Sequence, residues 1–253
     1  MLILTAFGIG KFIKAGFDAK KADSIDSQSY DIISKAKAIS EQAQEYCGVS
    51  LYVVGNKKMF VLGTTIKRFV KRFKKIKNFE MDNPIINEEI DKFKIKNQKI
   101  YELRELRGYG STIALGLLGG LFFGGIIVGA RARANLDRAY ANLAEAERIS
   151  EELHASADVC SAIRRRSYLY LRLLIRLDSI FSPLVYQMEE IIKKYGRNYF
   201  KYSVESQNNI IKAYVIAVAI KAAIDTPILT SDGKLTKISR LNASLIQEKM
   251  ESK

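Results

Sequence analysis

Residues 132–157 read ARANLDRAYANLAEAERISEELHASA, and small or apolar side chains recur in them at alternating steps of four and three. These positions are Ala132, Leu136, Ala139, Leu143, Ala146, Ser150, Leu153 and Ala157. The spacing predicts a helix with one stripe that packs along a second helix. A shifted series then continues the pattern through Ile163, Tyr170, Leu174, Leu177, Phe181 and Leu184. We therefore expect one long helix over 131–195, capped by Gly196.

The N-terminal part of the chain carries a similar pattern over residues 19–47. Its members are Ile25, Ser29, Ile32, Ala36, Ile39, Ala43 and Tyr46. We expect this helix to end at Gly48. Together the two series predict an all-α fold, an elongated bundle of long helices paired along heptad-like seams. With only 3 prolines in 253 residues, few positions break a helix.

Between these series, residues 111–130 read STIALGLLGGLFFGGIIVGA, twenty residues without a charge. A helix of that length spans about 30 Å, the thickness of a bilayer's hydrocarbon core. Glycines spaced four apart would give it a smooth face for another helix. The predicted membrane segment is centred on Gly116, Gly119, Gly120, Phe122, Phe123, Gly124, Gly125 and Gly129. It could be a transmembrane helix, a membrane-inserting hairpin, or a soluble element buried against protein.

Residues 49–78 are the most basic part of the chain. One predicted helix face is apolar, with Met59, Leu62, Ile66, Phe69, Phe73 and Ile76. Nine basic residues and no acidic one lie between Lys57 and Lys77. Such a helix can bind an anionic membrane surface, or it can be a core helix with a solvated basic face. The predicted lipid-binding residues are Lys67, Arg68, Lys71, Arg72, Lys74, Lys75 and Lys77.

The first eighteen residues combine apolar side chains with two lysines. The stretch Gly8-Ile9-Gly10-Lys11-Phe12-Ile13-Lys14 resembles the start of the magainin family of membrane-active peptides. That short resemblance implies a basic amphipathic helix that can lie in a lipid interface. An N-terminal helix packed on the rest of the protein is the alternative.

We divide the chain into three regions. Residues 1–83 hold the amphipathic and basic helices, 84–200 the long helical pair with the apolar segment, and 201–253 the C-terminal helices. In the last region, Ser203 is the expected N-cap of a helix over 204–225. Asp232-Gly233 is the expected turn of a small hairpin.

The sequence offers no catalytic constellation and no metal or cofactor site. His154 is the only histidine, and Cys47 and Cys160 are too far apart in sequence to form a C-x-x-C pair. His154 and Cys160 lie six residues apart, on roughly opposite sides of a helix, which excludes a dyad. We therefore expect a protein that is not an enzyme.

The net charge of +14 favours anionic partners. The basic segment keeps its aromatic side chains on its apolar face, which disfavours nucleic acid and favours lipid or a helical partner. We expect a membrane-associated protein, at a bacterial inner membrane or bound from the cytoplasm. It would insert through 111–130, bind anionic headgroups and form homo-oligomers, as a pore-forming or membrane-perturbing effector or as a scaffold. The alternative is a soluble coiled-coil adaptor whose glycine-rich segment packs against a protein partner.

Overall fold

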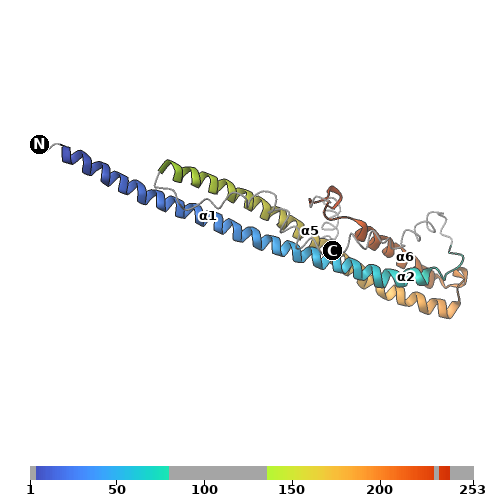
Figure 1. Ribbon diagram of the computed structural model, residues 1–253. Coiled ribbons are helices and arrows are strands. Elements are labelled where there is room, and N and C mark those ends of the chain that lie inside the picture. The colour runs from blue at the N-terminus through green and yellow to red at the C-terminus, as the bar shows by residue number, and fades with distance from the viewer. Residues whose placement is uncertain (1–3, 80–135, 231–233, 240–253) are drawn as a thin grey trace. The chain divides into compact units, whose positions relative to one another are not determined.

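The computed structural model describes residues 4–79, 136–230 and 234–239, and it confirms an all-α fold (Figure 1). The helical elements in chain order are α1 (Leu4–Val61), the π-helical turn η1 (Leu62–Ile66), α2 (Lys67–Phe73), α5 (Leu136–Tyr195), the 3₁₀ turn η2 (Tyr199–Lys201) and α6 (Val204–Asp225). Within the described residues, extended pairing is limited to two isolated bridges, Lys77 with Asn198 and Leu229 with Leu235.

The prediction that a helix ends at Gly48 was wrong, because α1 continues to Val61. Gly48 is itself buried, and its neighbours Cys47 and Leu51 are completely buried. Apolar burial on both sides of the glycine stabilises the helix by more than the roughly 1 kcal/mol that a glycine costs. Local propensity is overridden here by packing.

The buried stripe of α1 also departs from the predicted series after Ala36. Ile39 and Tyr46 are 48% and 45% exposed, whereas Ser40 and Gln44 are buried. A straight helix has 3.6 residues per turn, so the side that faces a partner drifts from a strict seven-residue repeat. The buried positions Ala36, Ser40 and Gln44, each four residues apart, follow that drift.

The long helix predicted over 131–195 is confirmed over the described residues, where α5 runs from Leu136 to Tyr195. Pro183 lies inside it with an exposed side chain, between the buried residues Phe181 and Val185. Gly196 follows with a φ of 80°, a left-handed conformation that favours glycine and ends the helix. The Ser203 side chain accepts a hydrogen bond from the Ser206 amide, which confirms the predicted cap of α6.

The chain divides into two compact units, and each combines segments that are distant in sequence. Of the described residues, unit 1 contains 4–46 and 136–162. In it, Ala22 and Ile25 of α1 pack with Ala139 of α5, and Ala36 packs with Ile149 and Leu153. Because the contacts advance together along both helices, α1 and α5 are parallel in this unit. Asn142 strengthens the pair by donating a 3.1 Å hydrogen bond to Asp26.

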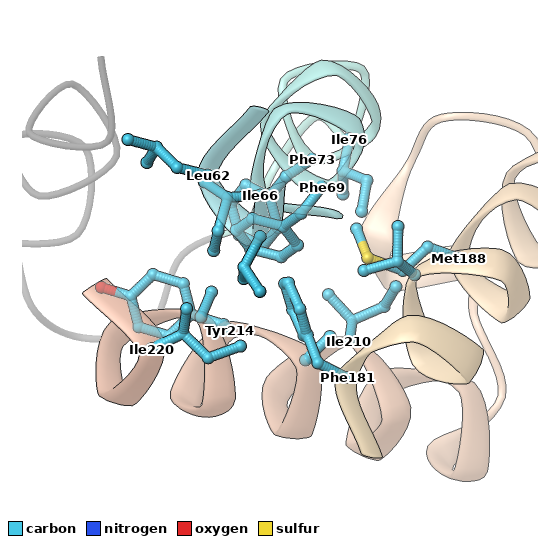
Figure 2. Close-up of a cluster of buried hydrophobic side chains, with 14 of the residues drawn as sticks. Leu62, Ile66, Phe69, Phe73, Ile76, Phe181, Met188, Ile210, Tyr214 and Ile220 are labelled. Atoms are coloured by element: carbon cyan, nitrogen blue, oxygen red, sulfur yellow. The ribbon is translucent and has the colours of Figure 1, made fainter. Parts of the chain in front are cut away.

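Of the described residues, unit 2 contains 47–79, 163–230 and 234–239, and its core is a three-helix arrangement. The end of α1, with η1 and α2, packs on α5 and α6 around one apolar cluster (Figure 2). At its centre the Phe69 ring lies 5.2 Å from that of Phe73 and 5.4 Å from that of Phe181. Tyr214 of α6 closes the other side, 5.8 Å from Phe73. This core fixes which side of α2 faces outward.

Some predictions lie outside the described residues. They include the apolar segment 111–130, with Gly116, Gly119, Gly120, Phe122, Phe123, Gly124, Gly125 and Gly129, and the turn at Asp232-Gly233. In the parts of the chain that the structure does describe, none of the helices is long and apolar enough to cross a bilayer.

Candidate functional site

The apolar face predicted for the basic segment is confirmed, and it belongs to the core of unit 2. Leu62, Ile66, Phe69, Phe73 and Ile76 are all buried there, as Figure 2 shows. Met59 is partly buried against the same cluster. In this fold α2 therefore has no apolar face left to insert into lipid, and any contact it makes with an anion uses its opposite, basic face.

Two of the nine basic residues serve the fold. Lys58 is 1% exposed, and its ammonium group donates hydrogen bonds of 3.0 and 2.9 Å to the carbonyl oxygens of Ile224 and Thr226. Those carbonyls lie at the C-terminal end of α6, where helical carbonyls lack partners and the helix dipole favours a cation. Lys57 forms a 2.6 Å ion pair with Asp178 of α5.

The π-helical turn η1 lies against that ion pair. Thr65 donates a 2.9 Å hydrogen bond to the second carboxylate oxygen of Asp178. Asp178 is only 12% exposed, so both of its oxygens are held by neighbours. This fixes α1 and η1 to α5 immediately before the basic face begins.

The basic residues predicted to bind lipid lie on the outside of unit 2. Six of them are exposed, namely Lys67, Arg68, Lys71, Lys74, Lys75 and Lys77, and Arg72 is partly buried. Some of these positive charges lie near the C-terminal end of α2, where they offset the negative end of the helix dipole. The number of exposed cations exceeds what such capping requires, because one or two are enough to offset the partial charge of a helix end.

Four of these residues share one face at the spacing i, i+3, i+4 and i+7: Arg68, Lys71, Arg72 and Lys75. Together with Glu189, Ile192 and Lys193 of α5 they line a groove of about 330 Å³. Lys67, Lys74 and Lys77 do not line it. The structure therefore divides the predicted basic residues into a groove set and a set outside the groove.

Tyr186 of α5 organises the two arginines of the groove. Arg68 donates a 3.0 Å hydrogen bond to the Tyr186 hydroxyl. The guanidinium carbons of Arg68 and Arg72 lie 6.0 and 5.5 Å from the centre of the Tyr186 ring. Cation–π attraction of this kind holds a guanidinium over a ring face. The arginine side chains are thus ordered before any ligand arrives.

Glu189 is the one acidic residue in the groove. It accepts a hydrogen bond from Arg72 and lies 3.8 Å from the Lys193 ammonium group. The hydrogen bond from Arg72, together with its positive charge, lowers the pKa of the Glu189 carboxyl. Glu189 is accordingly a carboxylate at neutral pH, and it offsets one of the five positive charges that line the groove.

Lys193 forms a 2.9 Å ion pair with Glu190 as well. The hydrogen bond to Glu190 raises the pKa of Lys193, which keeps that ammonium group protonated. Arg72 makes no hydrogen bond from its Nη1, a buried atom, to any of the described residues.

The remaining residues considered from sequence form no site in the described part of the chain. His154 is exposed, and Cys47 and Cys160 are buried and not joined in a disulfide. The described residues contain no cluster of side chains suited to a metal ion.

Sequence reasoning missed Tyr186, Glu189 and Lys193, because they come from a helix more than a hundred residues away. A local signal could have separated the groove set, however. The spacing of 68, 71, 72 and 75 places those cations on one helix face, whereas 67, 74 and 77 fall elsewhere. No protein-family model matches this chain, and no curated protein or solved structure shows significant similarity to it.

Proposed function

We propose that this chain is a membrane-associated helical protein without enzymatic activity. The basic face of α2 would hold it to anionic headgroups, and residues 111–130 would engage the hydrocarbon core. The observation that carries the proposal is the division of residues 62–77, which comprise η1, α2 and the turn after it, into two faces. The apolar residues lie in the core of unit 2, while six of the seven predicted lipid-binding residues are exposed.

This division determines the kind of lipid contact that α2 can make. A basic residue near an anionic membrane contributes about 1 kcal/mol, and the attraction declines within a Debye length of about 8 Å in physiological salt. The contact would therefore be peripheral and sensitive to salt. A salt-resistant attachment requires buried apolar area, which the uncharged segment 111–130 has the length and composition to supply.

Self-association through the glycine-rich segment is part of the proposal. Gly120→Leu and Gly124→Leu would place bulky side chains on the smooth face and separate packed helices in the membrane. We expect smaller oligomers from both variants in detergent, with vesicle binding unchanged. Oligomers of unaltered size would remove the glycine interface from the account.

The paired seams also belong to the proposal. In unit 1 the apolar contacts of Ala22 and Ile25 with Ala139, and of Ala36 with Ile149, support a coiled-coil-like parallel pair. A pore-forming or membrane-perturbing effector and a passive scaffold both use such a pair to carry a membrane segment. Leakage of a dye from vesicles on addition of the protein would favour the effector.

A soluble helical adaptor is a second candidate, favoured by the outer face of α1 in unit 2. Val49, Val53 and Phe60 are 53%, 38% and 57% exposed, at spacings of four and seven on one side of the helix. An apolar row of this kind suits a partner helix. The adaptor would require no lipid for any of its interactions.

Cell fractionation separates the two candidates. The full chain and a Ser111–Ala130 deletion would be expressed side by side, and the membrane fraction would be washed with carbonate and then extracted with detergent. The membrane proposal expects the full chain to resist carbonate and the deletion to be released. A full chain found in the soluble fraction would support the adaptor instead.

A further inference from the structure

We infer that the groove between α2 and α5 in unit 2 is a binding site for a compact phosphate group that carries more than one negative charge. The same chemistry occurs on a free oligophosphate and on the terminal phosphomonoester of a lipid headgroup. The inference rests on the proposed function, since the groove residues belong to the basic face. It deepens that proposal by replacing a diffuse attraction with a defined site.

The charge of the groove favours such a ligand. Arg68, Lys71, Arg72, Lys75 and Lys193 line the groove with a single carboxylate, Glu189. Lys71 and Lys75 form no ion pair within the described residues. Glu190, outside the groove, pairs with Lys193, so three positive charges remain in excess. Within one small concavity they repel one another, and this repulsion is relieved most by a ligand that concentrates negative charge.

The chemistry and order of the donors also favour a phosphate group. A guanidinium group presents several N–H donors in a plane, which match the oxygens of a phosphate, and ammonium groups add point charges. Tyr186 already holds Arg68 by a 3.0 Å hydrogen bond, and its ring lies beneath the Arg72 guanidinium. Side chains ordered in this way lose less conformational entropy on binding.

The size of the groove favours a small ligand. A volume of about 330 Å³ lies at the lower end of the range for small-molecule sites. It has room for one compact phosphorylated group. A phosphodiester of an ordinary anionic lipid carries one charge, whereas a phosphomonoester carries about −1.5 to −2 at neutral pH. The excess of groove cations therefore favours the phosphomonoester or an oligophosphate.

The decisive test compares two triple variants that remove the same charge. Arg68→Gln, Lys71→Gln and Lys75→Gln together empty the groove of three cations, while Lys67→Gln, Lys74→Gln and Lys77→Gln remove three that do not line it. Calorimetric titration with pyrophosphate should show affinity lowered at least about tenfold by the groove variant. The outside variant should stay within about twofold of the unaltered chain. Equal losses in the two variants, or no binding of pyrophosphate to the unaltered chain, would overturn the inference.

A lipid arm of the experiment identifies the source of the phosphate. Vesicles of a neutral lipid with added phosphatidic acid would be compared with vesicles of the same lipid with added phosphatidylglycerol, at matched surface charge. Preferential binding to phosphatidic acid that only the groove variant loses would assign the site to a headgroup. Pyrophosphate binding without that preference would assign it to a soluble oligophosphate.

These outcomes keep the inference distinct from the proposed function. If the unaltered chain binds phosphatidylglycerol vesicles and both triple variants lose that binding equally, the diffuse membrane contact stands and the groove site fails. If pyrophosphate binds and no vesicle does, the groove site stands and the membrane proposal fails.

A single variant that is expected to gain affinity serves as a control, because misfolding does not strengthen binding. Glu189→Gln removes the carboxylate that competes for Arg72, and its side chain is 43% exposed, so the core is not disturbed. We expect pyrophosphate to bind this variant several-fold more tightly, because a fourth positive charge in excess, that of Arg72, then faces the ligand. Unchanged or weaker binding would contradict the assigned site.

Discussion

Lys58 is buried, whereas most basic residues of the segment 57–77 are exposed. Its ammonium group is buried against the end of α6, and its Nζ also lies 5.5 Å from the centre of the Tyr170 ring. A buried cation costs desolvation energy, which hydrogen bonds to the Ile224 and Thr226 carbonyls and the helix dipole offset. Lys58 therefore joins α1 to α6 and is unavailable to an external ligand.

Replacing Lys58 with Met keeps the length of the side chain and removes its hydrogen bonds. We expect the free energy of unfolding to fall by about 2 kcal/mol, because two buried carbonyl oxygens lose their donor. Urea denaturation followed by circular dichroism would measure the change. The exposed residue Lys67, replaced in the same way, is the control, and its effect should stay within about 0.5 kcal/mol. A Lys58→Met protein as stable as the original would mean that desolvation cancels the hydrogen bonds.

Glu189 gives a pH prediction at the same scale. Its pKa is lowered in the folded protein by Arg72, so the carboxylate stabilises the fold above the ordinary glutamate pKa of about 4.3. That stabilisation is lost as the pH falls through the lowered pKa. Arg72→Gln should move the Glu189 pKa back toward its ordinary value, as measured by ¹³C NMR of the side-chain carboxyl.

Glu145 is an internal control in the same titration. Its pKa is also lowered, but by the hydrogen bond from Arg148 in unit 1. It should titrate at the same pH in the Arg72→Gln variant and in the original. A Glu189 pKa that does not move would show that the contact with Arg72 is not formed in solution.

At the scale of the element, two glycines differ in backbone conformation: Gly63 lies within a helical turn, and Gly196 ends a helix in a left-handed conformation. Gly63 lies in η1, has no atom within 4 Å of an added Cβ, and does not need a left-handed conformation. Gly196 also has space for a Cβ, but its φ is 80°. Gly63→Ala should stabilise the protein by about 0.5–1 kcal/mol, and Gly196→Ala should destabilise it by about 1 kcal/mol.

Urea denaturation of the two variants would check this pair. Neither substitution causes a steric clash. Opposite signs of the change in the free energy of unfolding would therefore reflect the backbone conformation at each glycine. Destabilisation by Gly63→Ala would indicate that the π-helical turn depends on glycine. An unaffected Gly196→Ala protein would indicate that the end of α5 relaxes into another conformation.

The elements also show what the sequence could predict and why it failed elsewhere. The apolar face at Leu62, Ile66 and Phe69 was predicted because helical periodicity is a local signal. Gly196 and Ser203 were predicted because caps depend on single residue types. The prediction that a helix ends at Gly48 was wrong because burial against distant residues outweighed the low helix propensity of glycine. A single sequence does not reveal such burial.

For the whole molecule, contacts between segments distant in sequence are what the sequence does not predict. The parallel pairing of α1 with α5 in unit 1 and the groove residues contributed by α5 in unit 2 depend on separations of more than a hundred residues. Helical periodicity gives the face of each helix and not its neighbour. The seven cations of the basic face could be predicted, and their division into groove and surface required the three-dimensional structure.

The proposed membrane binding would combine a salt-sensitive and a salt-resistant component. The exposed cations of α2 and of the residues directly after it would supply the first, and residues 111–130 the second. Because screening shortens the Debye length from about 10 Å at 0.1 M salt to about 3 Å at 1 M, only the second should persist in high salt.

The most direct measurement is flotation of the full chain with vesicles across a range of salt concentrations, using neutral and anionic lipids in parallel. We predict strong binding to anionic vesicles at low salt, a steep decline with added salt, and a residual bound fraction that disappears in the Ser111–Ala130 deletion. Failure to float with anionic vesicles at low salt, or equal binding to neutral and anionic vesicles, would contradict the account.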